Sequence, residues 1–138
     1  MSHFFAVNTR RLAAFLGVFF ISVLVAACSP QTPESVAKDY IKAVADNRID
    51  EAVEYFSLEN VKENDLTMVK NMKFHMIVGE QYSRIQSNGG MESVSASLVD
   101  RKDNLARVDV EIKHKNGKTR NDTLHLIQES GKWKVRLK

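Results

Sequence analysis

The spacing of apolar residues changes once along the chain, near residue 90. Between residues 33 and 87 apolar residues recur every three or four positions, and from Met91 onward they alternate with polar residues. The first spacing is that of a helix with one buried face, and the second is that of a strand with one buried face. The chain is therefore predicted to fold as an α+β domain in which helices precede an antiparallel sheet.

The first two helices are delimited by their end signals. Thr32-Pro33-Glu34 is typical of a helix start, with threonine as the N-cap, proline in the first helical position and an acid in the first turn. Asp46-Asn47 ends this helix, and a shorter one is expected at about residues 48–57. The apolar face of the second helix would consist of Ile49, Ala52, Val53 and Phe56.

The third segment, residues 64–87, admits two interpretations. An apolar stripe with one glycine runs through it in steps of three or four residues: Leu66, Val69, Met72, Met76, Gly79, Tyr82 and Ile85. Residues 74–78 could instead form a buried strand, and Gly79 costs a helix about 1 kcal/mol relative to alanine. A helix is favoured because the stripe continues without a slip and because Asn88-Gly89-Gly90 is a strong C-terminal stop.

Four runs of alternating residues predict a four-stranded antiparallel meander with one buried face. The inward positions are apolar: Val94, Ala96 and Leu98; Ala106, Val108, Val110 and Ile112; Leu124 and Leu126; Trp133, Val135 and Leu137. For these residues to share one face, the first two hairpins need loops of odd length and the third needs a loop of even length. We therefore expect the loops Arg101-Lys102-Asp103, Lys115-Asn116-Gly117 with a left-handed Gly117, and Ser130-Gly131.

The first 28 residues have the layout of a secretory signal. Arg10 and Arg11 form a positive flank, and the apolar run at residues 12–27 is short for a membrane-spanning helix of ~20 residues. The run ends in Leu24-Val25-Ala26-Ala27-Cys28, which resembles the bacterial lipobox, where the cysteine is diacylated before cleavage. A retained membrane anchor and an ordinary signal cut elsewhere are the alternatives.

The lipobox resemblance implies the organisation of the rest of the chain. Residues 1–27 would be a lipoprotein signal peptide, residues 28–32 a lipidated tether, and residues 33–138 a single α+β domain. The membrane would then be a partner through lipid on Cys28. Because Ser29 rather than an aspartate follows the cysteine, the resemblance also implies the outer membrane, with the domain facing the periplasm.

Composition narrows the function classes. The chain has 20 basic and 17 acidic residues, and removing Arg10 and Arg11 with the signal leaves 18 basic residues, so the remaining domain is almost neutral. A nearly neutral periplasmic domain argues against nucleic acid as a partner. Cys28 is the single cysteine, so the domain is expected to fold without a disulfide and to lack a thiol nucleophile.

Three stretches carry a family resemblance: residues 33–40, residues 88–94 and residues 131–135. With them, the segment 32–138 resembles the lipoproteins grouped as domain of unknown function 4878, a lumazine-binding-like branch of the nuclear transport factor 2-like (cystatin-like) fold. The resemblance implies three N-terminal helices packed on a curved four-stranded sheet, cone-shaped, with a cavity between. These motifs are caps, turns and core residues, and the family offers no catalytic residues to carry over.

Several side chains are candidates to line such a cavity: Tyr40, Tyr82, Met72, Met76 and Trp133. Phenolic hydroxyls could orient a ligand, and methionine adapts to varied apolar partners. The alternative is that these side chains fill the core, since Tyr40 and Trp133 fall on stripes that the core needs in any case.

Other candidates concern partners. His75, His114 and His125 lack the spacing of metal ligands, and no cofactor is expected. A basic row on the last strand, Lys132, Lys134, Arg136 and Lys138, could meet an anionic partner or could protect an edge strand. Val99 and Ile127, apolar on the outer face, hint at a homodimer.

Catalysis is not favoured, because no inward carboxylate is expected in the middle of a strand and Asp122 is placed at a strand end. The leading hypothesis is a membrane-anchored, non-enzymatic binding module for an apolar small ligand or an envelope protein. A structural, oligomerising envelope lipoprotein is the second hypothesis. An enzyme is the third, and it would require Asp122 or Glu80 to meet a tyrosine in a pocket.

Overall fold

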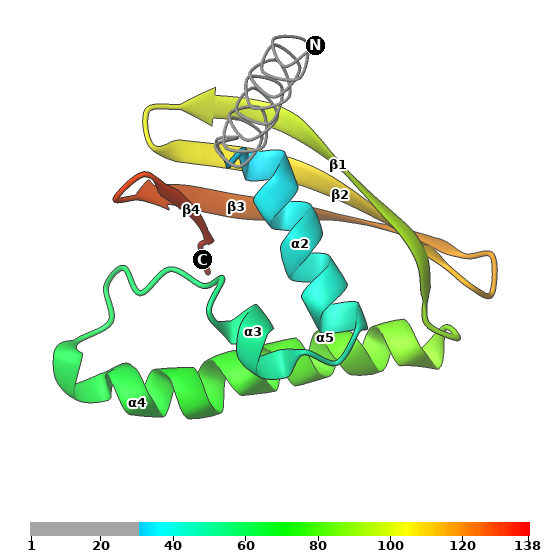
Figure 1. Ribbon diagram of the computed structural model, residues 1–138, viewed down its shortest axis with the longest axis horizontal. Coiled ribbons are helices and arrows are strands. Elements are labelled where there is room, and N and C mark those ends of the chain that lie inside the picture. The colour runs from blue at the N-terminus through cyan, green and yellow to red at the C-terminus, as the bar shows by residue number, and fades with distance from the viewer. Residues whose placement is uncertain (1–30) are drawn as a thin grey trace, which may run out of the picture. The chain divides into compact units, whose positions relative to one another are not determined.

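The computed structural model describes residues 31–138, which form one compact unit. The predicted signal peptide and Cys28 lie outside the described residues. The first helix, α2 (Pro33–Ala45), lies across one face of a four-stranded sheet (Figure 1). Its predicted start is confirmed: the Ser35 N–H donates to Thr32 Oγ1 at 3.1 Å, and the Thr32 N–H donates to Ser35 Oγ at 3.1 Å. This reciprocal cap satisfies two backbone donors at the helix end.

The helix predicted at residues 64–87 is confirmed, and the strand alternative is excluded. A 3-10 turn (Glu63–Asp65) leads into α4 (Leu66–Met68), a π-helical turn (Val69–Phe74) and α5 (His75–Ser87), which together form the long rod in Figure 1. The second helix, α3 (Ile49–Val53), is shorter than predicted. The helix ends before Phe56, which forms a parallel bridge with Val135 of the sheet.

The predicted buried face of the long helix is wrong in its middle. Met72 and Met76 are 68% and 69% exposed, whereas Phe74 is 2% and Val78 is 0% exposed. The π-helical turn explains the change, because it holds an extra residue and so rotates the following surface by about 100°. Consecutive inward-facing residues are therefore five positions apart at the turn, from Val69 to Phe74. The spacing is four again from Phe74 to Val78.

The sheet has the predicted meander order and antiparallel pairing. Its strands are β1 (Met91–Lys102), β2 (Leu105–His114), β3 (Thr119–Glu129) and β4 (Lys132–Val135). The Ser130-Gly131 turn is confirmed, with both residues at positive φ, and so is the loop at residues 115–117, with Gly117 at φ +86°. Asp122 lies within β3, opposite Val110, so its predicted place at a strand end is wrong.

The first hairpin satisfies the predicted parity in another way. Lys102 pairs with Leu105, so the turn has two residues, Asp103 and Asn104, and not the predicted three. A register shift between Leu98 and Asp100 supplies the odd residue, Val99, as a bulge within β1. The inward residues of β1 and β2 still share a face on the far side of this bulge.

The core lies between α2, α3, α5 and the sheet. Its largest fully buried side chains include Tyr40, Leu126, Val44 and Val78. Ile127 is also buried, at 6% exposure, so it does not contribute to an exposed dimer surface. Within residues 31–138 no helix is both long and apolar enough to cross a membrane.

Candidate functional site

A hollow of the described domain lies beside the point where the chain leaves β4. β4 has only four residues, and the tail of residues 136–138 leaves the sheet after Arg136, whose N–H still donates to the His125 C=O. On the other side of β4, the segment after α3 is held by two backbone bonds, Ser57 N–H to Val135 C=O and Val135 N–H to Tyr55 C=O, both 2.7 Å. The loop after Ser57 then swings away toward the long helix. The diverging tail and loop leave the space between them.

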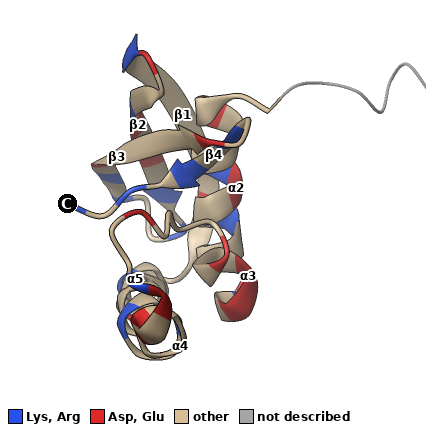
Figure 2. Cartoon of the chain, turned by 90° about the vertical axis from the view of Figure 1, so that its left-hand side faces the viewer, with Lys and Arg blue, Asp and Glu red and all other residues tan. Residues whose placement is uncertain are grey.

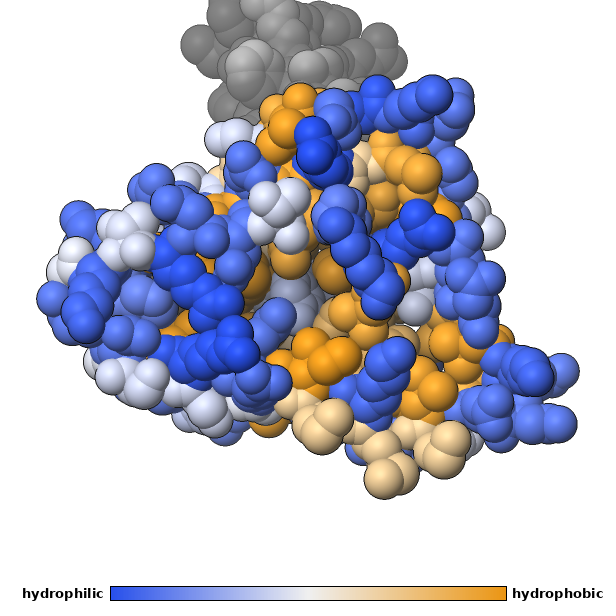
Figure 3. Space-filling view, turned by 180° about the vertical axis from the view of Figure 1, so that it is seen from behind, coloured by the Kyte–Doolittle hydropathy of each residue, from blue (hydrophilic) through white to orange (hydrophobic). Residues whose placement is uncertain are grey.

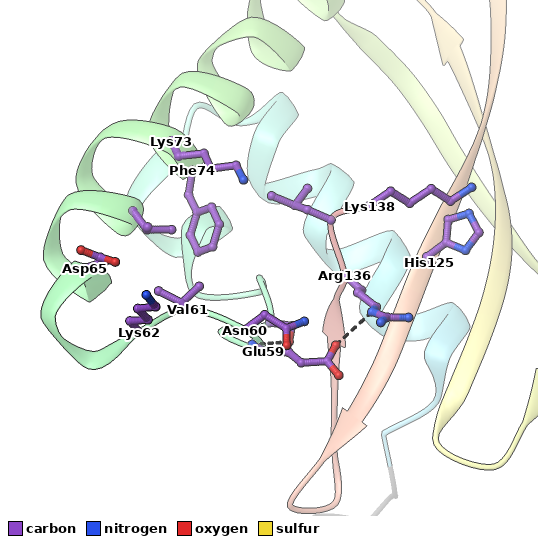
Figure 4. A pocket seen from close by; sticks show the side chains of 13 residues that line it. Glu59, Asn60, Val61, Lys62, Asp65, Lys73, Phe74, His125, Arg136 and Lys138 are labelled. Carbon is purple, nitrogen blue, oxygen red and sulfur yellow. Dashed lines mark hydrogen bonds and ion pairs between the residues drawn. The ribbon is translucent and has the colours of Figure 1, made fainter.

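We call this space the basic hollow; it has a volume of about 640 Å³ (Figure 4). Its wall is made by the loop after α3, the start of the long helix, the tail and one residue of β3: Ser57, Glu59, Asn60, Val61, Lys62, Asp65, Val69, Lys73, Phe74, His125, Arg136, Leu137 and Lys138. The volume is in the range of small-molecule sites in proteins. The apolar part is formed by Val61, Val69, Phe74 and Leu137.

Charge in the hollow is predominantly positive. Four basic and two acidic side chains line it. Arg136 is neutralised by Glu59, with Nε 2.9 Å from Oε2. Lys62, Lys73 and Lys138 take part in none of the ion pairs found within residues 31–138. Lysine and arginine also colour β4 and the tail in Figure 2. The hollow therefore combines an apolar floor with ammonium groups that no protein carboxylate pairs.

Nearby positive charges are one cause of the altered pKa of His125. Its pKa is lowered, first by burial and then by Lys138, Arg107 and Arg136. The imidazole is therefore neutral at pH 7. An anion bound beside these cations would offset their field and bring the pKa of His125 back up.

A second hollow of about 330 Å³ lies on the other side of the tail and shares His125, Arg136, Leu137 and Lys138 with the first. Tyr40 and Gln81 line it, and the Tyr40 hydroxyl donates to Gln81 Oε1 at 2.5 Å. Burial raises the pKa of the Tyr40 phenol, and the bond to Gln81 opposes that shift in part. The hydroxyl is thus a fixed, neutral hydrogen-bonding group.

The five residues predicted to line a cavity are not brought together. Tyr40 alone lines one of the hollows described above. Tyr82 packs against the core, and Trp133 is 2% exposed with the Arg101 guanidinium 5.0 Å from its ring centroid. Met72 and Met76 point to solvent, where apolar side chains gather along the long helix (Figure 3). The loop after α3 was not identified from the sequence as part of a site. The only hint in the sequence is that the charged residues Glu59 and Lys62 belong to neither a helical nor a strand pattern.

The carboxylates considered for catalysis are engaged elsewhere. Asp122 Oδ2 lies 2.9 Å from Arg120 Nε, and Glu80 pairs with Arg84. At the basic hollow, Ser57 Oγ donates to Glu129, and the same Oγ accepts the Glu59 N–H at 3.0 Å. These bonds fix the loop after α3. Among the described residues no three His, Cys, Asp or Glu side chains cluster as metal ligands.

Comparison with known proteins defines the family and the fold. The sequence profile of one family, described as domain of unknown function (DUF4878), matches residues 26–136. A candidate NTF2-like transpeptidase from Campylobacter jejuni is similar in structure, with a TM-score of 0.69, 24% identity, and coverage of 78% of this chain and 100% of that one. A de novo designed NTF2-fold protein, NT-9, is 21% identical at a TM-score of 0.46, covering 79% of this chain and 87% of the design. No curated protein matches the chain in sequence.

Proposed function

The chain belongs to the family described as domain of unknown function (DUF4878), with an NTF2-like α+β fold, and we propose that it is a non-enzymatic binding module of the cell envelope. The basic hollow would hold an amphiphilic ligand with an apolar body and an anionic group. The single observation that supports this most is the pairing of an apolar floor with three ammonium groups that have no carboxylate partner.

The physical argument concerns desolvation. Val69 and Leu137, both partly exposed, offer apolar surface, and burying a ligand's apolar surface contributes about 25 cal/mol per Å². The lysines supply the charge that an anionic group needs when it loses water. A neutral apolar ligand would leave the lysines without a counter-charge, and a purely hydrophilic anion would leave the floor exposed. The hollow therefore favours a long-chain carboxylate or a similar amphiphile.

Fluorescence of a dansylated fatty acid tests this proposal. We expect the probe to bind, oleate to displace it, and oleyl alcohol of the same chain length to compete poorly. Lys73→Gln should weaken probe binding about fivefold, which corresponds to about 1 kcal/mol for one partly solvated charge. The matched control is Lys118→Gln, in the β2–β3 turn outside the hollow, which should leave affinity unchanged. Equal effects of the two variants would contradict the assignment of the site.

Attachment to the membrane is a separate part of the proposal. The lipobox-like segment ending at Cys28 supports it, and α2 begins only five residues later, at Pro33. Globomycin, which blocks the lipoprotein signal peptidase, should make an unprocessed precursor accumulate in cells. An unchanged mobility after treatment would rule out lipoprotein processing.

The name of the Campylobacter jejuni protein raises acyl transfer as a second function. Such chemistry needs an activated nucleophile, and Cys28 is the only cysteine of this chain. Within the described residues Ser57 donates to Glu129 but is 8% exposed and already bonded on both sides, and Thr123 donates to Asp109 at 2.7 Å on the solvent-exposed side of the sheet. We therefore favour binding over catalysis. Native mass spectrometry of protein purified from its own cells should reveal a co-purifying species, and a clean, unliganded monomer would oppose binding.

A further inference from the structure

The sheet has an open edge along the first half of β3. β4 pairs only with residues 126–129 of β3, and the last bond between them is the Arg136 N–H to the His125 C=O at 2.7 Å. Figure 1 shows β3 continuing well beyond the end of β4. Residues 119–124 thus pair with β2 on one side and face no strand of the described domain on the other.

Backbone geometry shows which groups this edge offers. The even residues of β3 form the hydrogen-bonded pairs with β2, as the His114 N–H to Lys118 C=O bond at the hairpin end indicates. The N–H and C=O groups of the odd residues therefore point to the opposite side, toward β4 or, beyond it, toward the open edge. At the open edge these are the groups of Asn121 and Thr123, both of which are exposed.

The other edges of the sheet have bulges or a covering segment, whereas this one has neither. β1, the far edge strand, has a register shift near each end, and such bulges discourage pairing with another chain. β4 is covered at Val135 by the segment around Phe56. The β2–β3 ladder runs without a register shift, and the open stretch contains neither proline nor lysine. Arg120 and Asp122 lie opposite the buried Ile112 and Val110, and such inward charges discourage most added strands, so this straight edge accepts a strand that supplies the opposite charges.

The residues along this edge identify the added strand. We propose that the open edge of β3 pairs with the same edge of a second copy of this chain, antiparallel about a twofold axis at Asn121. In that register Arg120 lies opposite Asp122 of the second copy, and the reverse, while Thr119 lies opposite Thr123. Opposite charges in directly facing positions stabilise a strand pair. Arg120 and Asp122 already pair within one chain, with Nε 2.9 Å from Oδ2, and their side chains are 35% and 38% exposed, so a facing copy extends this pair into a cluster of four alternating charges.

The same residues reject the neighbouring registers. Only odd residues offer their backbone groups at this edge, so odd residues must face odd residues. One strand can therefore slip along the other only in steps of two residues. A slip in one direction places Arg120 opposite Arg120, and a slip in the other places Asp122 opposite Asp122. Both put like charges in contact, which is destabilising. The strand is thus complementary to itself in one register, and the twofold contact closes as a dimer with a continuous eight-stranded sheet.

Disulfide trapping tests this contact in the full chain, in a Cys28→Ser background so that the introduced cysteine is the only thiol. The twofold brings the two copies of residue 121 to a Cα separation of about 5.5 Å, within the roughly 4.4–6.8 Å that a disulfide spans. Mild oxidation of the detergent-solubilised Asn121→Cys variant should give a covalent dimer on a non-reducing gel. Ser97→Cys, exposed on β1, is the control and should give at least tenfold less dimer.

Charge exchange makes the test specific. Arg120→Asp or Asp122→Arg, each added to the Asn121→Cys variant, should reduce the trapped dimer at least fivefold. The double exchange, Arg120→Asp with Asp122→Arg, should restore it, while thermal melts show that all variants are folded. Equal trapping at residues 97 and 121, a double exchange that does not rescue, or a crosslink only to a protein of different mass would overturn the proposal. Because no residue of the stretch 119–124 lines the basic hollow, probe binding by the same variants reports separately on the proposed function.

Discussion

Replacing Phe74 and Met72 by alanine, in separate variants, tests the π-helical turn and the register that it imposes. The two residues lie two positions apart on one helix. Phe74 is 2% exposed and its ring centroid lies 4.6 Å from that of Phe56, whereas Met72 is 68% exposed. Sequence periodicity predicts the opposite order of burial. The two free energies of unfolding therefore discriminate between the two registers.

The structure gives different magnitudes for the two changes. Phe74→Ala removes a buried aromatic side chain and leaves a cavity, which typically costs about 3–5 kcal/mol. Met72→Ala removes a side chain already in water, so we expect a change of no more than about 0.5 kcal/mol. In urea, with an m-value of about 1.5 kcal/mol/M, a loss of about 4 kcal/mol lowers the midpoint by about 2.7 M.

Urea unfolding followed by circular dichroism provides the measurement. A domain of this size has a total stability of only about 5–15 kcal/mol, so the Phe74→Ala variant could be partly unfolded in buffer. Phe74→Leu is the milder companion, because it keeps most of the buried volume and should retain a measurable transition. If Met72→Ala costs as much as Phe74→Ala, the helix is continuous α-helix and the π-helical turn is wrong.

Three further changes have defined outcomes. The pKa of His75 is raised, first by its bond to Asp50. The charged ring therefore stabilises the fold fully below its ordinary pKa of 6.5, and this stabilisation is lost as the pH rises through the raised pKa. His75→Asn should lower the melting temperature at pH 5.5 and much less at pH 8.5. Gly131 has a φ of +77°, which alanine adopts only with strain. Gly131→Ala should lower the free energy of unfolding by about 1–2 kcal/mol, measured by thermal unfolding. Tyr40→Phe removes the bond to Gln81 and should cost about 0.5–1.5 kcal/mol in urea, with Tyr82→Phe as the control.

Strand parity illustrates how far the sequence specifies the fold. Alternation within each run places Val108 and Val110 on the same face as Leu124 and Leu126, and the structure agrees. Parity requires an odd residue between β1 and β2 but does not say where it lies. A loop residue and a bulge satisfy it equally, and the bulge at Val99 is chosen by the twist and bending of the sheet, which are tertiary properties.

The candidate site was less accessible to sequence reasoning. Much of its wall comes from the loop after α3 and the tail after Val135. Apolar residues in these segments have no helical or strand spacing, so the sequence pattern does not predict where they lie. Lys73 and Phe74, adjacent in sequence, both line the hollow, and Phe74 faces inward because of the π-helical turn. Alternation did identify a basic row at the end of the chain, but it could not show that Arg136 pairs with Glu59 while Lys138 stays unpaired. Those differences depend on which loop lies opposite.

The bridge between Phe56 and Val135 has a consequence for the order of folding. Val135 pairs with Leu126 on one side and bridges to Phe56 on the other, so it joins two parts of the chain that are synthesised far apart in time. Hairpins form in microseconds, but contacts of such long sequence separation carry a large loop-closure entropy and slow the folding of a domain. If the chain crosses a membrane N-terminus first, as we propose, Phe56 stays uncovered until Val135 follows, and the helices need a holding chaperone. In either case we expect β4 to be the last element to gain protection from hydrogen exchange.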